Sequence, residues 1–156
     1  MVLRKLDARA HSRDELARAL SRKEVPEEVA GQLLDRFEEL GLVDDADFAA
    51  RWTASRHGAR GLSRRAVGEE LRRKGVPRDV IDSALAGISA DDELEAATDL
   101  ARRKWRAGSG IPEERLTRRV LAALARKGYG PDQAWQALRR ARAESEEATE
   151  LPPEPW

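Results

Sequence analysis

Pairs of basic residues recur at nearly constant intervals along this sequence. Arg22-Lys23, Arg73-Lys74 and Arg126-Lys127 are separated by 51 and then 53 residues. Cations that recur at one point of a stacked unit are expected to form a row, which suits the phosphates of a nucleic-acid backbone. The alternative is that they only complement the dipole at helix C-termini and stay solvated. We favour backbone contact, because the pairs do not stand alone.

Further arginines and lysines surround these pairs in the sequence. They fall on the segments expected to precede each turn and on the ends of the expected long helices. Taken together, the set predicts non-specific contact with single- and double-stranded DNA. The candidate contact residues are Lys23, Arg56, Arg60, Arg64, Arg65, Arg72, Arg73, Lys74, Arg102, Arg103, Lys104, Arg118, Arg119, Arg126 and Lys127.

Residues that could perform catalysis have simpler structural interpretations. Asp44-Asp45 and Asp91-Asp92 are paired carboxylates, but each pair precedes an expected helix, where Asp is a favoured cap. Gly108-Ser109-Gly110 lacks the following Lys-Ser or Lys-Thr of a phosphate-binding loop. The chain has no cysteine, and His11 and His57 have no partners at metal-ligand spacing. We therefore predict a protein that is not an enzyme and that uses no cofactor or metal.

The composition favours a thin helical protein with a zoned surface. Of 156 residues, 40% are hydrophobic and 37% charged, and the formal net charge is zero. Basic residues concentrate in 51–74 and 102–127, whereas acidic residues concentrate in 27–47 and 144–154. A zero total therefore does not exclude a polyanionic partner. No apolar run approaches a membrane span, and no signal peptide is visible, so a cytoplasmic monomer is expected.

Apolar spacing and helix caps predict an all-α fold, since no segment alternates with period two. Ser12 and Glu15 form a capping-box pattern, Asp44 and Ser63 stand at expected helix starts, and Pro26 and Pro77 open further helices. The repeat period indicates an elongated tandem array of three-helix, helix-turn-helix-like repeats. The expected divisions are repeat 1 over 1–43 with a truncated first helix, repeat 2 over 44–90, repeat 3 over 91–143, and an acidic, proline-rich disordered tail over 144–156.

Several side chains have expected positions within these helices. Leu3 and Leu6 should share the apolar side of the first segment, and Ser55 should face inward. Trp52 and Trp105 are expected to anchor the core of the long helices. Trp135 is expected to be half exposed.

Helix-turn-helix proteins read bases with the helix that follows the turn. Here that helix is rich in acid, so sequence-specific base readout is disfavoured, because phosphates would repel it. Its carboxylates are Glu27, Glu28, Asp35, Glu38 and Glu39 in the first repeat and Asp79 and Asp82 in the second.

Four stretches carry a resemblance to the RecX family of bacterial recombination regulators. They are Ser12-Arg13-Asp14-Glu15-Leu16, Gly41-Leu42-Val43-Asp44-Asp45-Ala46-Asp47-Phe48-Ala49, Glu69-Glu70-Leu71-Arg72-Arg73-Lys74-Gly75-Val76-Pro77 and Arg126-Lys127-Gly128-Tyr129. The resemblance implies a curved array of three-helix repeats that binds the RecA filament and damps its recombinase, ATPase and co-protease activities in DNA repair and the SOS response. It runs from about residue 6 to about residue 142, and it departs from the family in its short N-terminus.

Two other functions remain open from the residues alone. The chain could be a general helical DNA-binding or architectural protein with no preference for filaments. It could also be a helical protein-interaction scaffold whose charges serve only solvation.

Overall fold

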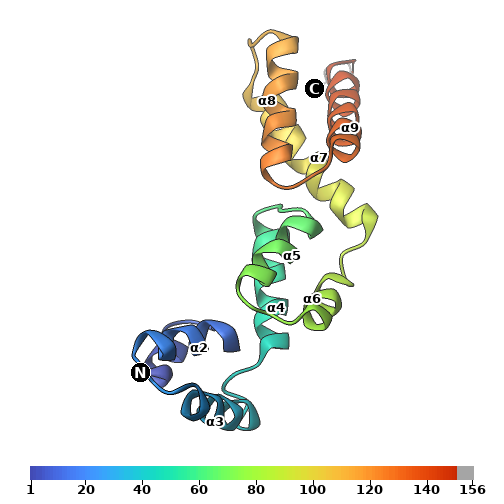
Figure 1. Ribbon diagram of the computed structural model, residues 1–156. Helices are drawn as coiled ribbons and strands as arrows, with labels where there is room; N and C mark the ends of the chain where they lie inside the picture. The colour runs from blue at the N-terminus through green and yellow to red at the C-terminus, as the bar shows by residue number, and fades with distance from the viewer. Residues whose placement is uncertain (151–156) are drawn as a thin grey trace, which may run out of the picture. The chain divides into compact units, whose positions relative to one another are not determined.

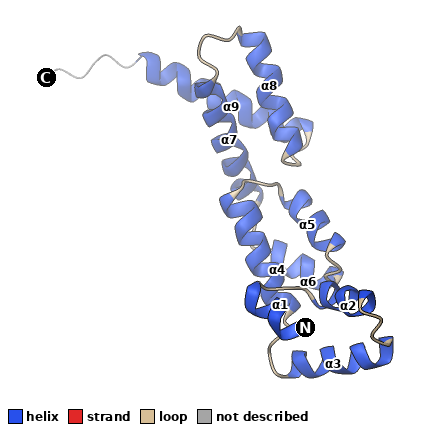
Figure 2. Cartoon of the chain, turned by 90° about the vertical axis from the view of Figure 1, so that its left-hand side faces the viewer, coloured by secondary structure: helices blue, strands red, loops and turns tan. Residues whose placement is uncertain are grey.

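The computed structural model describes residues 1–150, except for the side chains of residues 6–8. None of these 150 residues forms a strand, which confirms the all-α prediction (Figure 2). The helices are α1 (Val2–Ala8), α2 (Arg13–Arg22), α3 (Glu27–Glu39), α4 (Asp45–Thr53), the π-helix η1 (Ala54–Ala59), α5 (Arg64–Arg73), α6 (Arg78–Leu85), α7 (Ala90–Ala107), α8 (Glu113–Arg126) and α9 (Pro131–Glu150).

The chain divides into two compact units. The first unit comprises Met1–Ser55 and Val67–Gly87, and the second comprises Arg56–Ala66 and Ile88–Trp156. Each unit contains an apolar core formed by its own elements.

The N-terminal part of the first unit is built by α1, α2 and α3. Its buried core consists of Val2, Leu16, Leu20, Ala30, Leu34 and Val43. Ser12 accepts a hydrogen bond from the Glu15 amide while Glu15 caps the Ser12 amide, which confirms the predicted capping box. Leu3 is 55% exposed and Val2 is the buried residue of this turn. The side chain of Leu6, expected on the same side as Leu3, lies outside the described residues.

The remainder of the first unit packs α4 against α6, with Val67 and Leu71 of α5 buried. Asp44 caps α4 through the Asp47 amide, as predicted. Phe48 and Ala49 are buried, but Ser55 is exposed, contrary to the sequence expectation. The reason is that the α-helix ends at Thr53 and continues as η1, whose wider turn changes the face on which each residue falls.

The second unit packs α7, α8 and α9 against one another (Figure 1). Its core includes Ala97, Ala101, Val120, Leu124 and Leu138. The small residues Ala97 and Ala101 on α7 let the neighbouring helices approach closely.

Two sequence expectations for the second unit need correction. Helix α7 begins at Ala90 because Ser89 and Asp92 form a capping box, so the start lies before Asp91. Helix α9 continues to Glu150, so residues 144–150 are helical rather than disordered. The remainder of the predicted tail, including Trp156, lies outside the described residues.

Candidate nucleic-acid interface

A hollow of about 270 Å³ in the first unit is lined almost entirely by basic side chains. We call it the N-terminal basic hollow. It lies where the end of α1, one side of α2 and the end of α5 meet. Its lining residues are Lys5, Arg9, His11, Glu15, Arg18, Arg22, Arg73 and Lys74.

Among the side chains that the structure describes, Glu15 is the one acidic group that lines this hollow. Its carboxylate accepts a hydrogen bond from Arg9 at 3.1 Å and lies 3.8 Å from Nζ of Lys74. Burial raises the pKa of Glu15, but the Arg9 hydrogen bond, the Lys74 charge and the Ser12 amide outweigh it and hold the pKa below its ordinary value. Glu15 therefore stays ionised and fixes Arg9 and Lys74 in place.

His11 is a buried imidazole in the same hollow, with Nδ1 3.5 Å from the Glu15 carboxylate. Burial, followed by the charge of Arg9, lowers the pKa of His11, and Glu15 only partly opposes these effects. His11 is therefore neutral at pH 7 and adds no charge to the hollow.

Lys74 is held more firmly than its exposed neighbours Arg72 and Arg73. Its Nζ lies 4.5 Å from the centroid of the Trp52 ring, and Trp52 in turn stacks on Phe48 with 5.8 Å between ring centroids. Lys23, by contrast, is an exposed C-cap of α2. The lysines of the repeated pairs thus have different surroundings.

Three lining residues were missed from the sequence: Lys5, Arg9 and Arg18. Arg22 precedes Lys23 in the repeated pair, so the repeat itself was a usable signal for that residue. Lys5 and Arg9 lie four residues apart, as do Arg18 and Arg22, and this spacing places each pair on one helix face. The spacing would have predicted two short rows of basic side chains, but it could not have shown that the two rows lie close together.

A second basic site, the α7–α8 groove, lies within the second unit and has a volume of about 440 Å³. Lys104, Arg119 and Arg126 line it together with apolar residues such as Ile111 and Val120. Within residues 1–150 and the side chains described there, these three cations form no ion pair. The structure thus brings together three of the predicted contact residues.

Other predicted contact residues have their charge neutralised or their side chain engaged within the second unit. Arg102 pairs with Asp99 at 2.5 Å and with Glu144 at 2.7 Å. Arg118 pairs with Glu114 at 2.7 Å. Such pairing makes Arg102 and Arg118 weaker candidates than Lys104, Arg119 and Arg126.

The remaining candidates lie on or next to η1, at the start of α5, on α7 and at the C-cap of α8. Arg65 donates to the Gly128 carbonyl at 3.1 Å, and Arg103 donates to the Asp99 carbonyl at 3.4 Å. Arg60 and Arg64 are exposed, and Arg56 and Lys127 are half-buried. Lys127 has a structural role as well, because its carbonyl accepts from the Ser63 amide at 2.8 Å.

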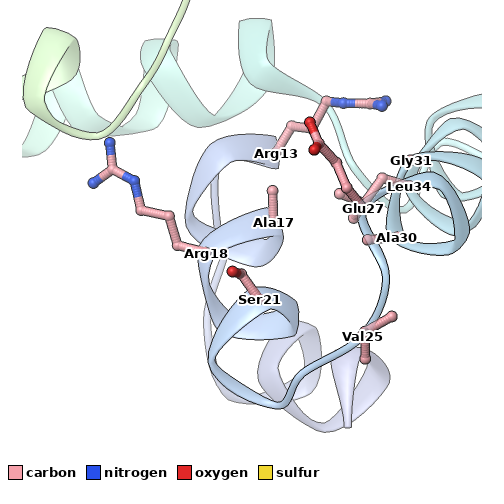
Figure 3. Close-up of a pocket in the computed structure, with 9 residues that line it drawn as sticks. All are labelled: Arg13, Ala17, Arg18, Ser21, Val25, Glu27, Ala30, Gly31 and Leu34. Atoms are coloured by element: carbon pink, nitrogen blue, oxygen red, sulfur yellow. The ribbon is translucent and has the colours of Figure 1, made fainter.

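A further groove of about 420 Å³ lies between α2 and α3 (Figure 3). Small residues line it, among them Ala17, Ser21 and Gly31. The guanidinium of Arg13 is held by Asp35 at 2.7 Å and Glu38 at 2.9 Å, and Arg18 points away from α3 (Figure 3).

The described part of the chain also lacks a group of three or more His, Asp or Glu side chains that could hold a metal ion. None of the helices within residues 1–150 is long and apolar enough to cross a membrane.

Comparisons with known proteins give a consistent result. Residues 1–37, 44–85 and 91–138 match, respectively, the first, second and third three-helix domains of RecX. "Regulatory protein RecX" of Streptomyces coelicolor is 45% identical over 150 residues, which cover 96% of this chain and 80% of that protein. The protein of the same name from Thermobifida fusca is 44% identical over 139 residues, covering 89% of this chain and 75% of that protein.

Solved structures agree with the fold. A crystal structure of regulatory protein RecX aligns with a TM-score of 0.73 at 23% identity, covering 89% of this chain and 68% of that chain. RecX from Lactobacillus salivarius aligns with a TM-score of 0.77 at 16% identity, covering 90% of this chain and 92% of that chain. The family matches and the identities above 40% show that this chain belongs to the RecX family.

Proposed function

We propose that this protein is a non-enzymatic regulator that binds RecA filaments on single-stranded DNA and inhibits their recombinase, ATPase and co-protease activities. The observation that supports this most is the match to all three RecX domains along the chain. The relatives are named regulatory proteins, which favours a regulatory rather than a catalytic role. We further propose that it acts in the cytoplasm as a monomer, in DNA repair and the SOS response.

The two basic sites support the proposal that the protein contacts DNA. The N-terminal basic hollow gathers cations from α1, α2 and the distant end of α5, and the α7–α8 groove gathers them from two consecutive helices. Such clusters suit a phosphate backbone of any sequence, whereas the acidic face of α3 does not. Binding is therefore proposed to be non-specific with respect to bases.

The direct test is the ATPase activity of RecA on single-stranded DNA. Added to preformed filaments, the protein should lower ATP hydrolysis at amounts below one per RecA subunit. Unchanged hydrolysis at equimolar protein would refute the regulatory proposal.

A charge-reversal pair tests the contribution of the basic residues to inhibition. Arg72→Glu with Arg73→Glu removes two exposed cations from the end of α5, and it leaves Lys74 with its structural contacts to Glu15 and Trp52. The double variant should require more protein for half-inhibition of the ATPase. The matched control is Arg36→Glu with Arg51→Glu, which reverses two exposed cations of the same unit outside the basic hollow.

A general DNA-binding protein is the second candidate function, because residues of this chain alone form both basic sites. Equal affinity for naked duplex and for RecA filaments, together with unchanged ATPase activity, would favour it over the regulator.

A further inference from the structure

The N-terminal basic hollow carries more positive charge than its own carboxylates neutralise. Six basic side chains line it, and the acidic groups in contact with them are Glu15 and Asp14, the latter paired with Arg18 at 2.7 Å. Counting only the described side chains, four positive charges remain in excess. In the part of the chain whose side chains are described, Lys5, Arg22 and Arg73 form no ion pair.

Three separate elements must converge to produce this concentration of charge. Lys5 and Arg9 belong to the last turn and the C-cap of α1. Arg18 and Arg22 follow one face of α2, and Arg73 ends α5. A merely solvated surface has no reason to bring like charges from three elements into one concave site, because their mutual repulsion disfavours the folded state.

Helix C-termini usually disfavour anions, since their carbonyls carry partial negative charge. At the end of α5 this obstacle is reduced, because side chains of the first helices bond to the terminal carbonyls. Arg18 donates to the Arg73 carbonyl at 3.3 Å, and Ser12 donates to the Lys74 carbonyl at 2.6 Å. The oxygen atoms that would repel an anion are thus already engaged.

Part of the hollow is also fixed before any ligand arrives. Glu15 holds Arg9 and Lys74, and the ring of Trp52 supports Lys74 from the other side. A preformed cationic site loses less conformational entropy when it binds a ligand than a set of free surface side chains does.

We propose that the N-terminal basic hollow is a binding site for phosphate groups. Guanidinium groups match the oxygen geometry of phosphate and can bind two of its oxygens at once. The volume of about 270 Å³ falls below the range of about 300–1,000 Å³ of typical apolar ligand pockets. A compact, strongly charged group therefore fits the hollow better than a drug-sized apolar molecule does.

Two sources can supply this chemistry: the phosphodiester backbone of DNA and a free polyphosphate. In the first case the inference rests on the proposed DNA contact and assigns it to particular residues. In the second case the hollow is a separate small-anion site on the same protein.

Calorimetric titration of the whole protein with two probes distinguishes these sources. The probes are an oligothymidylate, which offers a phosphodiester backbone, and inorganic tripolyphosphate, which offers phosphate alone. The test variant is Lys5→Gln with Arg22→Gln, which removes two unpaired cations and keeps long polar side chains. The matched control is Arg36→Gln with Arg51→Gln, two exposed arginines elsewhere in the unit. Circular dichroism melting confirms that both variants are folded.

Loss of two charge-assisted contacts should weaken binding by about tenfold or more in the test variant and not in the control. Weakened binding of oligothymidylate alone assigns the hollow to the DNA backbone, and weakened binding of tripolyphosphate as well assigns it to phosphate from either source. A folded test variant with wild-type affinity for both probes overturns the inference, as does a wild-type protein that binds neither. Inhibition of the RecA ATPase, measured on the same variant, is a separate readout. If the hollow proves not to bind phosphate but inhibition is unchanged, only the further inference is refuted and the regulatory proposal is not.

Discussion

Tyr129 shows how a single polar atom can join two distant segments of the second unit. The residue is buried in the turn after α8, and its hydroxyl donates to the Gly61 carbonyl at 2.8 Å. Both residues belong to the second unit, and the bond spans 68 positions of sequence. The hydrogen bond therefore holds the loop before α5 against the turn that carries Lys127.

Tyr129→Phe should lower the free energy of unfolding by about 1 kcal/mol at pH 7, since it leaves the Gly61 carbonyl without its partner. Urea denaturation followed by circular dichroism measures the loss. Burial raises the pKa of Tyr129 to about 12, so the wild type also loses stability as pH rises from 10, where the unfolded tyrosine ionises, towards 12. The free energy of unfolding of the variant should not fall in this way between pH 10 and 12. An equal pH dependence in the two proteins would contradict this prediction.

His11 gives the opposite pH dependence. Because burial and Arg9 hold its folded pKa below the ordinary 6.5, the unfolded chain takes up the proton first as pH falls. The stability of the wild type should decline as pH falls through 6.5, and the stability of His11→Gln should decline less over the same interval. The groups facing His11 are Arg9, Lys5 and Glu15, and all three remain in the variant. Thermal melts at pH 7.5 and 5.5 test this, and parallel losses in both proteins would refute it.

At the scale of the helix, the caps were the most predictable features. Ser12 with Glu15 and the lone Asp44 act as local signals, because each bonds to an amide three residues away. The capping box of Ser89 and Asp92 was missed because Asp91-Asp92 looked like a starting pair by itself. The end of α9 was missed for a related reason: acidic composition alone does not show whether a helix continues.

The candidate site was less predictable, because ion pairs join distant segments. Arg102 meets Glu144 from 42 positions away, and Lys74 meets Glu15 from 59 positions away. The sequence shows which residues are basic, but only the packing of helices decides which cations keep their charge free. Lys5 and Arg9 were missed since nothing in the repeat marks them.

The turn between α8 and α9 provides a test at this same scale. Gly128 has φ of +93°, and an added Cβ would lie 2.5 Å from Ser63 Oγ and 2.6 Å from Ala66 Cβ. Gly110 has φ of +89°, but an added Cβ would meet open space. Both alanine variants have a similar backbone strain, so Gly128→Ala should be more destabilising than Gly110→Ala by about 1–3 kcal/mol from overpacking alone. Urea denaturation curves provide the comparison, and equal losses would show that the close approach does not matter.

The whole molecule combines a formal net charge of zero with strongly unequal local charge. The isoelectric point that the sequence implies, about 6.8, corresponds to a slightly negative net charge at pH 8. Long-range attraction by net charge is thus absent at that pH. Binding to DNA must then depend on the cations that touch the phosphates.

The salt dependence of binding distinguishes attraction by net charge from direct contact between cations and phosphates. At about pH 8, the logarithm of the affinity for single-stranded DNA should fall linearly with the logarithm of the salt concentration. The slope should be about −2 or steeper, because three phosphate contacts would give a slope of about −2. Arg72→Glu with Arg73→Glu and Arg36→Glu with Arg51→Glu change the net charge equally, so an effect of net charge would alter both slopes alike. We expect a shallower slope only for the first pair, because counterions are released only where a cation meets a phosphate. Fluorescence anisotropy with a labelled oligothymidylate measures both slopes, and identical slopes would place the DNA contact away from the end of α5.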